Sequence, residues 1–322
     1  MKVAIDVSPL RQTRAGTSRY LGGLLPHLER LVDVQHVAWG GGGRLTAVAR
    51  DVAWYPLALS RRARGADVLH CPTFRGPARS STPLVVTVHD LAVLRHPEAF
   101  NRWTRAYSRA TVPRVLRAAD RVITVSDFTK REVVEIIGVE ESRIHVVPNA
   151  AGDAFAPNGA RTDGDYVLAV GTLEPRKNLP RLARAARLAD VELRVAGAPG
   201  WGSVDVEGAT FLGFVPDDEL ARLYRGALCV AYPSLYEGFG IPVLEALACG
   251  AAVVTSAGTA MAEVANGAAV LVDPRDEESI ADGIREAIAH RDELGRKGPE
   301  VASAYSWARS AELTAAVYRE LA

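Results

Sequence analysis

Short apolar runs alternate with amphipathic stretches along most of this chain, and the alternation predicts parallel strands joined by helices. Strands in the first half are predicted at residues 2–7, 34–39, 52–57, 68–70, 84–89, 121–125 and 144–147. A helix is expected from about Thr17, with a buried face made of Leu21, Leu24, Leu25 and Leu28. Ligands of such sheets bind at the carboxyl ends of the strands, so Gly16 and His89, each just past a strand, point at a site.

The apolar pattern stops at residues 148–164, where small and turn-forming residues predominate, and then starts again. Strands in the second half are predicted at residues 166–170, 191–196, 210–214, 228–232, 252–255 and 269–272. We therefore predict two doubly wound α/β domains, at residues 1–155 and 156–304, followed by a final helix at residues 305–322.

Composition agrees with a globular protein of two domains. The chain has 322 residues, of which 48% are hydrophobic, and its mean hydropathy is near zero. No apolar run reaches the roughly 20 residues of a membrane span, and the first residues resemble a strand more than a signal peptide. Three widely spaced cysteines, Cys71, Cys229 and Cys249, form neither a disulfide framework nor a metal cluster, so we expect a cytoplasmic protein.

Charge is even over the whole chain but uneven along it. Residues 1–150 carry 22 basic and 13 acidic side chains, whereas residues 151–322 carry 16 basic and 25 acidic ones. This split favours two domains with different partners, or complementary faces across a cleft.

Candidate chemistry is concentrated in residues 234–250, SLYEGFGIPVLEALACG, which follow a predicted buried strand. The chain turns at Gly238 and Gly240, and Pro242 can then start a helix that Gly250 ends. The N-terminus of such a helix binds phosphate through its N–H groups and its positive dipole end. Glu237 in the turn and Glu245 in the helix place a carboxylate on each side, which suits the hydroxyl groups beside such a phosphate.

A second candidate segment, GTLEPRKNLPRL, follows the strand that ends at residue 170. Gly171 permits the turn and Asn178 can cap the next helix, while Arg176 and Lys177 project from the loop between them. A guanidinium and an ammonium together can bind a diphosphate.

These two segments carry a family resemblance. The string EGFGIPVLEALACGAAVV resembles the donor-site signature of the retaining nucleotide-sugar glycosyltransferases of family 4, and GTLEPRKN matches the G-x-x-x-x-[RK]-K-N pattern of the same family. The resemblance implies the α/β fold called GT-B, with two Rossmann-like domains, an interdomain cleft, and a terminal helix that crosses back to the first domain. The residues of these two motifs are most similar to those of mannosyltransferases that use GDP-mannose in cell-surface polysaccharide synthesis.

The resemblance also implies residue roles. It implies that Arg176 and Lys177 bind the donor diphosphate. It also implies that Glu245 binds the ribose hydroxyls, that Glu237 binds the hydroxyls of the transferred sugar, and that His89 approaches that sugar. For His89, a packing or helix-capping role stays open.

Three further parts of a donor site are expected. Gly16 matches a glycine loop that closes over the phosphate, although Ala15 replaces the first glycine of the fuller pattern. By the same resemblance, Val215 occupies the position whose backbone the family uses to bind the nucleobase. The N–H groups of Gly238, Phe239 and Gly240 can neutralise the charge on a departing diphosphate together with Arg176 and Lys177.

No metal or other cofactor is then required, and the single D-x-D, at Asp163 and Asp165, is interpreted as turn chemistry. No second carboxylate can be placed beside Glu237 for a double displacement. The resemblance implies that a hexosyl group is transferred with retention, so we expect a same-face substitution in which the leaving phosphate takes the acceptor's proton.

Two alternatives stay open: a nucleotide-sugar epimerase or hydrolase of the same fold, and a non-catalytic subunit that binds nucleotide sugars. The expected partners are a GDP- or UDP-linked donor and a sugar or lipid-linked acceptor, with no nucleic acid. A dehydrogenase is disfavoured because no G-x-G-x-x-G follows either opening strand.

Residues 95–117 are strongly basic. Arg102, Arg105 and Arg109 recur at helical spacing, with Phe100, Trp103, Tyr107 and Ala110 on another stripe. One interpretation is a helix that rests on an anionic membrane, which would place the enzyme peripherally on the inner face. The other is a solvated basic face on a helix packed by its aromatic side.

Overall fold

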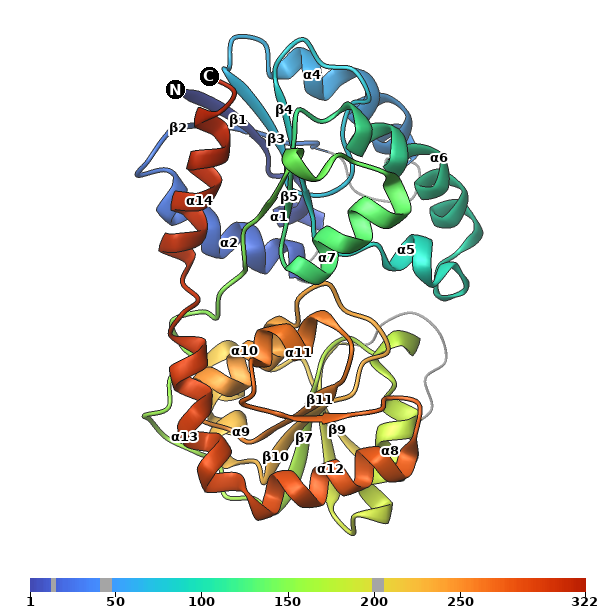
Figure 1. Cartoon of the computed structure of the whole chain (residues 1–322), viewed down its shortest axis with the longest axis vertical. Helices are drawn as coiled ribbons and strands as arrows, with labels where there is room; N and C mark the ends of the chain where they lie inside the picture. The colour runs from blue at the N-terminus through green and yellow to red at the C-terminus, as the bar shows by residue number, and fades with distance from the viewer. Residues whose placement is uncertain (13–15, 41–47, 199–205) are drawn as a thin grey trace. The chain divides into compact units, whose positions relative to one another are not determined.

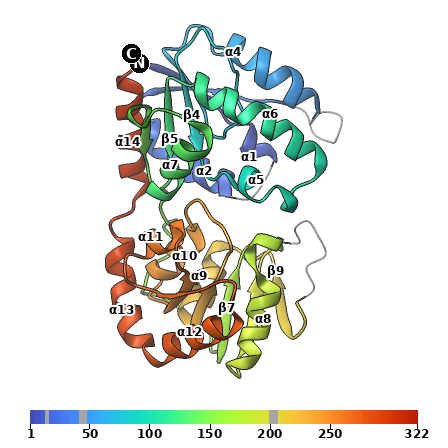
Figure 2. The same cartoon turned by 45° about the vertical axis from the view of Figure 1, so that its right-hand side comes forward.

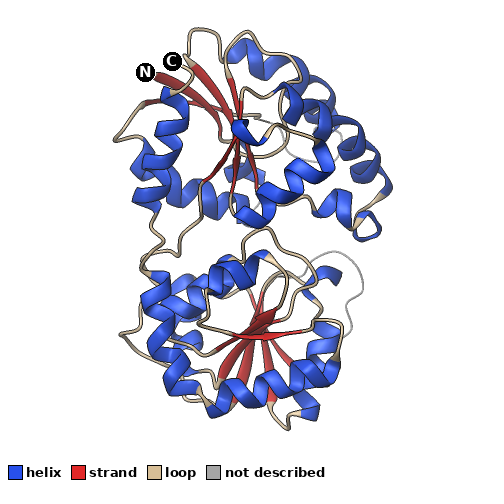
Figure 3. Cartoon of the chain, in the orientation of Figure 1, coloured by secondary structure: helices blue, strands red, loops and turns tan. Residues whose placement is uncertain are grey.

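The computed structural model describes residues 1–12, 16–40, 48–198 and 206–322. The chain forms two compact units, one made of Met1–Asn149 with Ser306–Ala322 and the other of Ala150–Tyr305. The predicted boundary lay after residue 155, and the structural one lies after Asn149. In the described residues each unit contains a parallel six-stranded sheet with helices on both faces, as Figure 3 shows.

In unit 1 the strand order is β2-β1-β3-β4-β5-β6, and every pairing is parallel. The strands are β1 (Lys2–Asp6), β2 (Asp33–Val37), β3 (Val68–Cys71), β4 (Leu84–Val88), β5 (Arg121–Thr124) and β6 (Ile144–Val146). The helical elements are α1 (Ser8–Gln12), α2 (Gly16–Leu28), η1 (Arg50–Ala58), α4 (Leu59–Arg62), α5 (Ala92–Arg95), η2 (Pro97–Ala99), α6 (Arg102–Ala118), α7 (Asp127–Glu132), η3 (Val133–Ile137), η4 (Glu141–Arg143) and α14 (Trp307–Arg319).

The final helix α14 packs on α2, as Figures 1 and 2 show, so it belongs to unit 1 as the resemblance implied. The contact is close at Gly23, where an added Cβ would lie 2.2 Å from the Trp307 ring. The leucines predicted for the buried face of α2 are buried there. The opposite face of the sheet carries a core built with η1, α4, α6 and η3.

A buried polar chain connects α14 to the sheet and to α2. The Tyr318 hydroxyl lies 2.6 Å from His70 Nδ1, and His70 Nε2 lies 2.8 Å from Thr87 Oγ1. The Thr87 hydroxyl in turn lies 3.3 Å from the Tyr20 hydroxyl. All four side chains are at most 1% exposed, so these polar groups satisfy one another where water cannot reach them.

One predicted strand is wrong. Residues 52–57 lie within η1, a π-helix, and not in a sheet. Its buried side chains are Asp51, Trp54 and Tyr55, a helical spacing, whereas Val52 and Leu57 are more than half exposed. A short apolar run has no periodicity that distinguishes a strand from a buried helical turn, and here the run forms a helical turn.

In unit 2 the strand order is β12-β11-β10-β7-β8-β9, again parallel throughout. The strands are β7 (Tyr166–Val170), β8 (Glu192–Ala196), β9 (Ala209–Gly213), β10 (Cys229–Tyr232), β11 (Val253–Ser256) and β12 (Val270–Val272). The helices are η5 (Pro175–Lys177), α8 (Leu179–Leu188), α9 (Asp217–Gly226), α10 (Ile241–Ala248), α11 (Ala260–Ala265), α12 (Glu277–Ala289) and α13 (Arg291–Ala302).

The segment predicted as a linker is held against unit 2. Arg225 on α9 donates hydrogen bonds to the carbonyls of Ala156 and Ala160, and the Thr162 hydroxyl lies 2.6 Å from the Tyr166 hydroxyl. Among the described residues, no helix combines the length and the apolar character needed to cross a bilayer.

Candidate active site

The candidate site of unit 2 lies at the carboxyl ends of β7 and β10, which are neighbours in the sheet. The chain leaves β7 through Gly171, whose φ of +142° a side chain would strain, and continues into η5, which carries Arg176 and Lys177. The loop after β10 carries Glu237. Because parallel strands present their carboxyl ends at one edge, the two loops meet, and the Leu235 N–H donates to the Arg176 carbonyl at 2.8 Å.

Glu237 bridges Arg176 and Lys177, the two residues that are predicted to bind the diphosphate. Its Oε2 accepts a hydrogen bond from Arg176 Nη1 at 2.7 Å, and its Oε1 accepts one from Lys177 Nζ at 2.6 Å. The side chains of Arg176, Lys177 and Glu237 are 17%, 11% and 9% exposed. The structure therefore brings together three residues that the sequence assigned to one site, in a nearly dry environment where charge-charge interactions are strong.

Two further residues hold this cluster, and the sequence did not single them out. Glu174 Oε2 accepts from Arg176 Nε at 2.8 Å. The Tyr232 hydroxyl accepts from Lys177 Nζ and donates to Glu237 Oε1 at 3.2 Å. Their signals were present: a carboxylate two residues before the arginine, and a tyrosine at the carboxyl end of a buried strand.

Burial and pairing oppose each other in setting the pKa of Glu237. Burial raises this pKa, but the positive charges and hydrogen bonds of Arg176 and Lys177 outweigh it and lower the pKa to about 2. Burial, followed by the negative charge of Glu237, raises the pKa of Tyr232 well above its ordinary value. At neutral pH the cluster therefore holds an ionised Glu237 and a neutral Tyr232.

The loop from β10 to α10 is fixed from several sides. The Ser256 hydroxyl donates to the Ser234 carbonyl at 2.6 Å, and Asn178 Nδ2 donates to the carbonyls of Pro233 and Pro274. Asn178 was predicted to cap α8 with its side chain, and that prediction is wrong. It stands at the cap position with φ of +62°, where its side-chain amide ties three segments together and no side-chain cap bond forms.

Gly238, Phe239 and Gly240 are buried and lead directly from Glu237 into α10. Gly240 has φ of +96°, and an added Cβ there would lie 2.7 Å from Met261 Cγ. Pro242 stands in the first turn of α10 and Gly250, with φ of +70°, follows its end, as the sequence predicted. Helix α10 thus begins four residues after Glu237.

The remaining predicted residues of unit 2 lie apart from the hydrogen bonds of this cluster. Glu245 on α10 is 1% exposed, and its Oε2 accepts from the Tyr224 hydroxyl at 3.2 Å. Val215 is 9% exposed and lies between β9 and α9. The ribose and nucleobase roles of these two residues stay predictions.

His89 and Gly16 belong to unit 1. His89 follows β4, and its Nε2 lies 2.9 Å from the Pro72 carbonyl, which can only accept, so Nε2 carries the proton and Nδ1 has the lone pair. Burial lowers the pKa of His89, and its ring contacts the Tyr20 ring edge-on at 4.8 Å. Gly16 is the exposed first residue of α2, while Ala15 lies outside the described residues.

The basic segment does not pack by its aromatic side, so that interpretation is wrong, while the membrane interpretation stays a prediction. Helix α6 is buried through Ser108, Val112, Val115 and Leu116, not through its aromatic stripe. Trp103 is 50% exposed and stacks on Tyr107. Arg95 is held by Glu132 and Glu135, so only the later arginines contribute to a basic surface.

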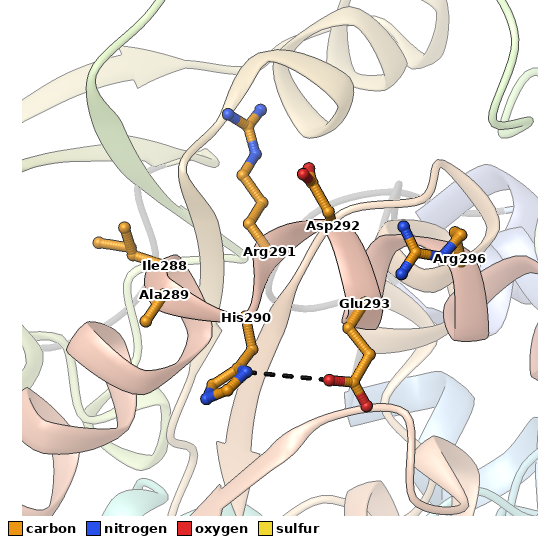
Figure 4. Close-up of a pocket in the computed structure, with 7 residues that line it drawn as sticks. All are labelled: Ile288, Ala289, His290, Arg291, Asp292, Glu293 and Arg296. Atoms are coloured by element: carbon orange, nitrogen blue, oxygen red, sulfur yellow. Dashed lines mark ion pairs between the residues drawn. The ribbon is translucent and has the colours of Figure 1, made fainter.

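A pocket of about 410 Å³ lies elsewhere in unit 2, where α12 meets α13. Figure 4 shows its lining, which includes the His290–Glu293 ion pair of 3.8 Å. It adjoins the last residue of α12, whereas Pro274, which Asn178 contacts, precedes the first. The 13 residues of α12 extend about 20 Å, so this pocket is separate from the Glu237 cluster.

Among the described residues, no group of three or more His, Cys, Asp or Glu side chains is arranged to hold a metal ion. Asp163 and Asp165 lie exposed in the irregular segment before β7.

Comparisons with known proteins agree on one family. Residues 16–151 match a family model described as Glycosyltransferase Family 4, and residues 152–301 match one described as Glycosyl transferases group 1. The O-antigen chain mannosyltransferase B of Escherichia coli is 31% identical over 79% of this chain and 74% of its own length. A D-inositol 3-phosphate glycosyltransferase of Mycolicibacterium smegmatis is 32% identical over 74% of this chain and 62% of its own length.

Solved structures share the architecture. Sucrose-phosphate synthase from Thermosynechococcus elongatus has a TM-score of 0.80 at 20% identity, covering 100% of this chain and 99% of its own. Anabaena HepE in complex with UDP and glucose has a TM-score of 0.73 at 20% identity, covering 98% of each chain. With the strand orders of its two units and the matches along its whole length, the chain belongs to glycosyltransferase family 4 and has the GT-B fold.

Proposed function

We propose that this protein transfers a hexosyl group from a nucleotide-diphosphate sugar to an acceptor hydroxyl, with retention of configuration and without a metal ion. The observation that carries the proposal is the Arg176–Lys177–Glu237 cluster at the carboxyl edge of the second sheet. The loop that carries Glu237 leads directly into the N-terminus of α10. Two cations and a helix dipole suit a diphosphate, and a carboxylate suits sugar hydroxyls.

In this mechanism the bond from the anomeric carbon to the β-phosphate oxygen breaks, and Arg176 and Lys177 stabilise the charge that develops on that oxygen. The acceptor oxygen bonds to the same face of the sugar, and its proton goes to the departing phosphate. Glu237 orients the sugar hydroxyls. Its two hydrogen-bonded cations support this role over that of a nucleophile, because pairing weakens a carboxylate's attack.

For the donor we propose GDP-mannose, with a product in polysaccharide, glycolipid or lipid-linked oligosaccharide synthesis. The support is the likeness to the O-antigen mannosyltransferase, together with the wording of the two sequence motifs. A UDP-sugar is the competing donor, since HepE binds UDP and glucose.

The test is a thermal-shift panel of UDP, GDP and their sugars, followed by a transfer assay with and without EDTA. A ligand that binds only the folded protein raises its melting temperature, and at a given concentration a tighter ligand raises it more. We expect one nucleotide family to stabilise the protein and transfer to persist in EDTA. Donor turnover that does not depend on acceptor would instead favour a hydrolase or epimerase, and binding without turnover would favour a non-catalytic subunit.

We also propose that the exposed end of α6 contacts anionic lipid. Trp103 is half exposed there beside the exposed Arg102 and Arg109, which is the chemistry of an interfacial helix. Vesicles containing phosphatidylglycerol should retain more protein than neutral vesicles, and an R102E/R109E double variant should lose that preference. Equal retention on both vesicle types would exclude this membrane contact.

A further inference from the structure

The Glu237 cluster balances its own charges. Glu237 and Glu174 provide two negative charges, and Arg176 and Lys177 provide two positive ones. Arg176 donates from Nε to Glu174 and from Nη1 to Glu237, while the Lys177 ammonium donates to Glu237 and Tyr232. A phosphate that approaches these cations therefore competes with a carboxylate already bound to both of them.

We propose that Glu237 is an internal competitor of the diphosphate and that it sets the preference of the site for a nucleotide sugar over a nucleoside diphosphate. This inference rests on the proposed function. As phosphate oxygens replace Glu237 at Arg176 Nη1 and Lys177 Nζ, the Glu237 carboxylate must find other hydrogen-bond donors, because an ionised carboxylate that is 9% exposed cannot be left without partners.

A nucleotide sugar meets this requirement and a nucleoside diphosphate does not. The hydroxyls of the sugar can donate to Glu237 as its cations turn to the phosphate, so every charged group in the site keeps a partner. After transfer, the nucleoside diphosphate offers phosphate but no sugar hydroxyl, and Glu237 competes with it for the cations. Specificity for the donor and release of the product then follow from the same carboxylate.

Glu174 has a different part in this exchange. It binds Arg176 through Nε, on the other side of the guanidinium from the bond between Nη1 and Glu237. It can therefore stay bound to Arg176 while Nη1 changes partners. Glu174 therefore holds Arg176 in place, and Glu237 is the carboxylate that exchanges with the phosphate.

The test measures dissociation constants of UDP, GDP, UDP-glucose and GDP-mannose by calorimetry for the wild type, Glu237→Gln, Lys177→Ala and Glu277→Gln. Glu277→Gln is the matched control, because it removes a carboxylate from an Arg–Glu pair elsewhere in unit 2. We expect Glu237→Gln to bind the nucleoside diphosphate about 10-fold more tightly than the wild type, with no such gain for the nucleotide sugar, and Glu277→Gln to change neither.

The outcomes separate this inference from the proposed function. If Lys177→Ala binds nucleotides as well as the wild type does, the diphosphate assignment itself fails. If Lys177→Ala weakens binding but Glu237→Gln does not tighten the nucleoside diphosphate, only the competition fails. Should Glu237→Gln not fold, Glu237→Asp replaces it, because the shorter side chain keeps the charge but cannot reach both cations, and it should also bind the nucleoside diphosphate more tightly.

Discussion

Lys177 Nζ lies 2.6 Å from Glu237 Oε1, and both side chains are about nine-tenths buried. Neither ion can be hydrated as it would be in the unfolded chain, so each depends on the other for its solvation. The pair joins two loops that are separated by 60 residues. It therefore contributes both to the shape of the site and to the stability of unit 2.

Replacing Lys177 should harm stability and activity together. Lys177→Met leaves Glu237 buried with Arg176 as its remaining cation, and we expect a loss of about 1–3 kcal/mol in the free energy of unfolding. Transfer should fall by roughly 100-fold or more, because a charge aimed at the leaving phosphate is gone. Lys297→Met is the control, since its pair with Glu293 is exposed and should contribute little to stability. Urea unfolding and initial rates measure both effects.

Glu237 should make unit 2 sensitive to strong acid only. Its pKa in the folded protein is about 2, below the ordinary 4.5, so the folded state favours the ionised form. The resulting stabilisation, about 3 kcal/mol, is fully present above pH 4.5 and is lost as the pH falls toward 2. Urea midpoints of the wild type and Glu237→Gln should therefore differ by a constant amount from pH 6 to 8 and converge below pH 4. A difference that already shrinks between pH 8 and 6 would contradict this assignment.

Gly240 should not tolerate a side chain. Gly240→Ala adds a Cβ at φ of +96° and 2.7 Å from Met261 Cγ, and we expect it to destabilise unit 2 by about 1–3 kcal/mol and to displace the start of α10. Gly22→Ala is the comparison, because Gly22 is exposed in α2 with open space around it and should gain up to about 1 kcal/mol. Thermal melting and nucleotide affinity check both variants; a Gly240→Ala protein with wild-type values would refute the strain.

His70 should make unit 1 sensitive to mild acid. Burial, followed by the nearby His89, lowers the pKa of His70 to about 3 from 6.5. The unfolded chain then binds the extra proton first, so stability is full above pH 6.5 and falls below it, by up to about 1.4 kcal/mol per pH unit. In His70→Asn the melting temperature should change less between pH 7 and pH 5 than in the wild type. Parallel pH profiles would exclude His70 as the source.

Tyr318→Phe tests the same buried chain from its other end. It removes the hydroxyl that lies 2.6 Å from His70 Nδ1 and leaves the ring in place, so unit 1 should lose about 1–3 kcal/mol. Nucleotide affinity, which we assign to unit 2, should not change. A large loss of nucleotide binding at unchanged stability would show that Tyr318 has another role.

Most of the fold could be predicted from the sequence because parallel strands that are buried on both faces consist of short apolar runs. Every predicted strand but one is present, and the exception, residues 52–57, has an apolar run of the same length inside a π-helix. Trp54 and Tyr55 face the core from that helix. Whether such a run forms a helix or a strand depends on the elements packed around it and not on its own sequence.

The motif residues of the site could also be predicted, since Arg176, Lys177 and Glu237 stand next to glycines and prolines that mark turns. The partners of these residues were harder to predict. Tyr232 reaches Lys177 because β10 lies beside β7, which no local pattern encodes. Glu174 stands two residues before Arg176, but the sequence alone does not show that the two side chains pair. The same holds for Asn178, whose amide bonds to Pro233 and Pro274, 55 and 96 residues away, replaced the local cap that its position suggested.

The return of α14 to unit 1 has a consequence for synthesis on the ribosome. Residues 150–305 form a continuous unit that can fold as it emerges, whereas the first 149 residues wait for Trp307 and Tyr318 to cover Tyr20 and His70. At typical elongation rates the wait lasts on the order of ten seconds. The domain translated first is therefore completed last, and during that interval its α2 face is open to chaperones and proteases.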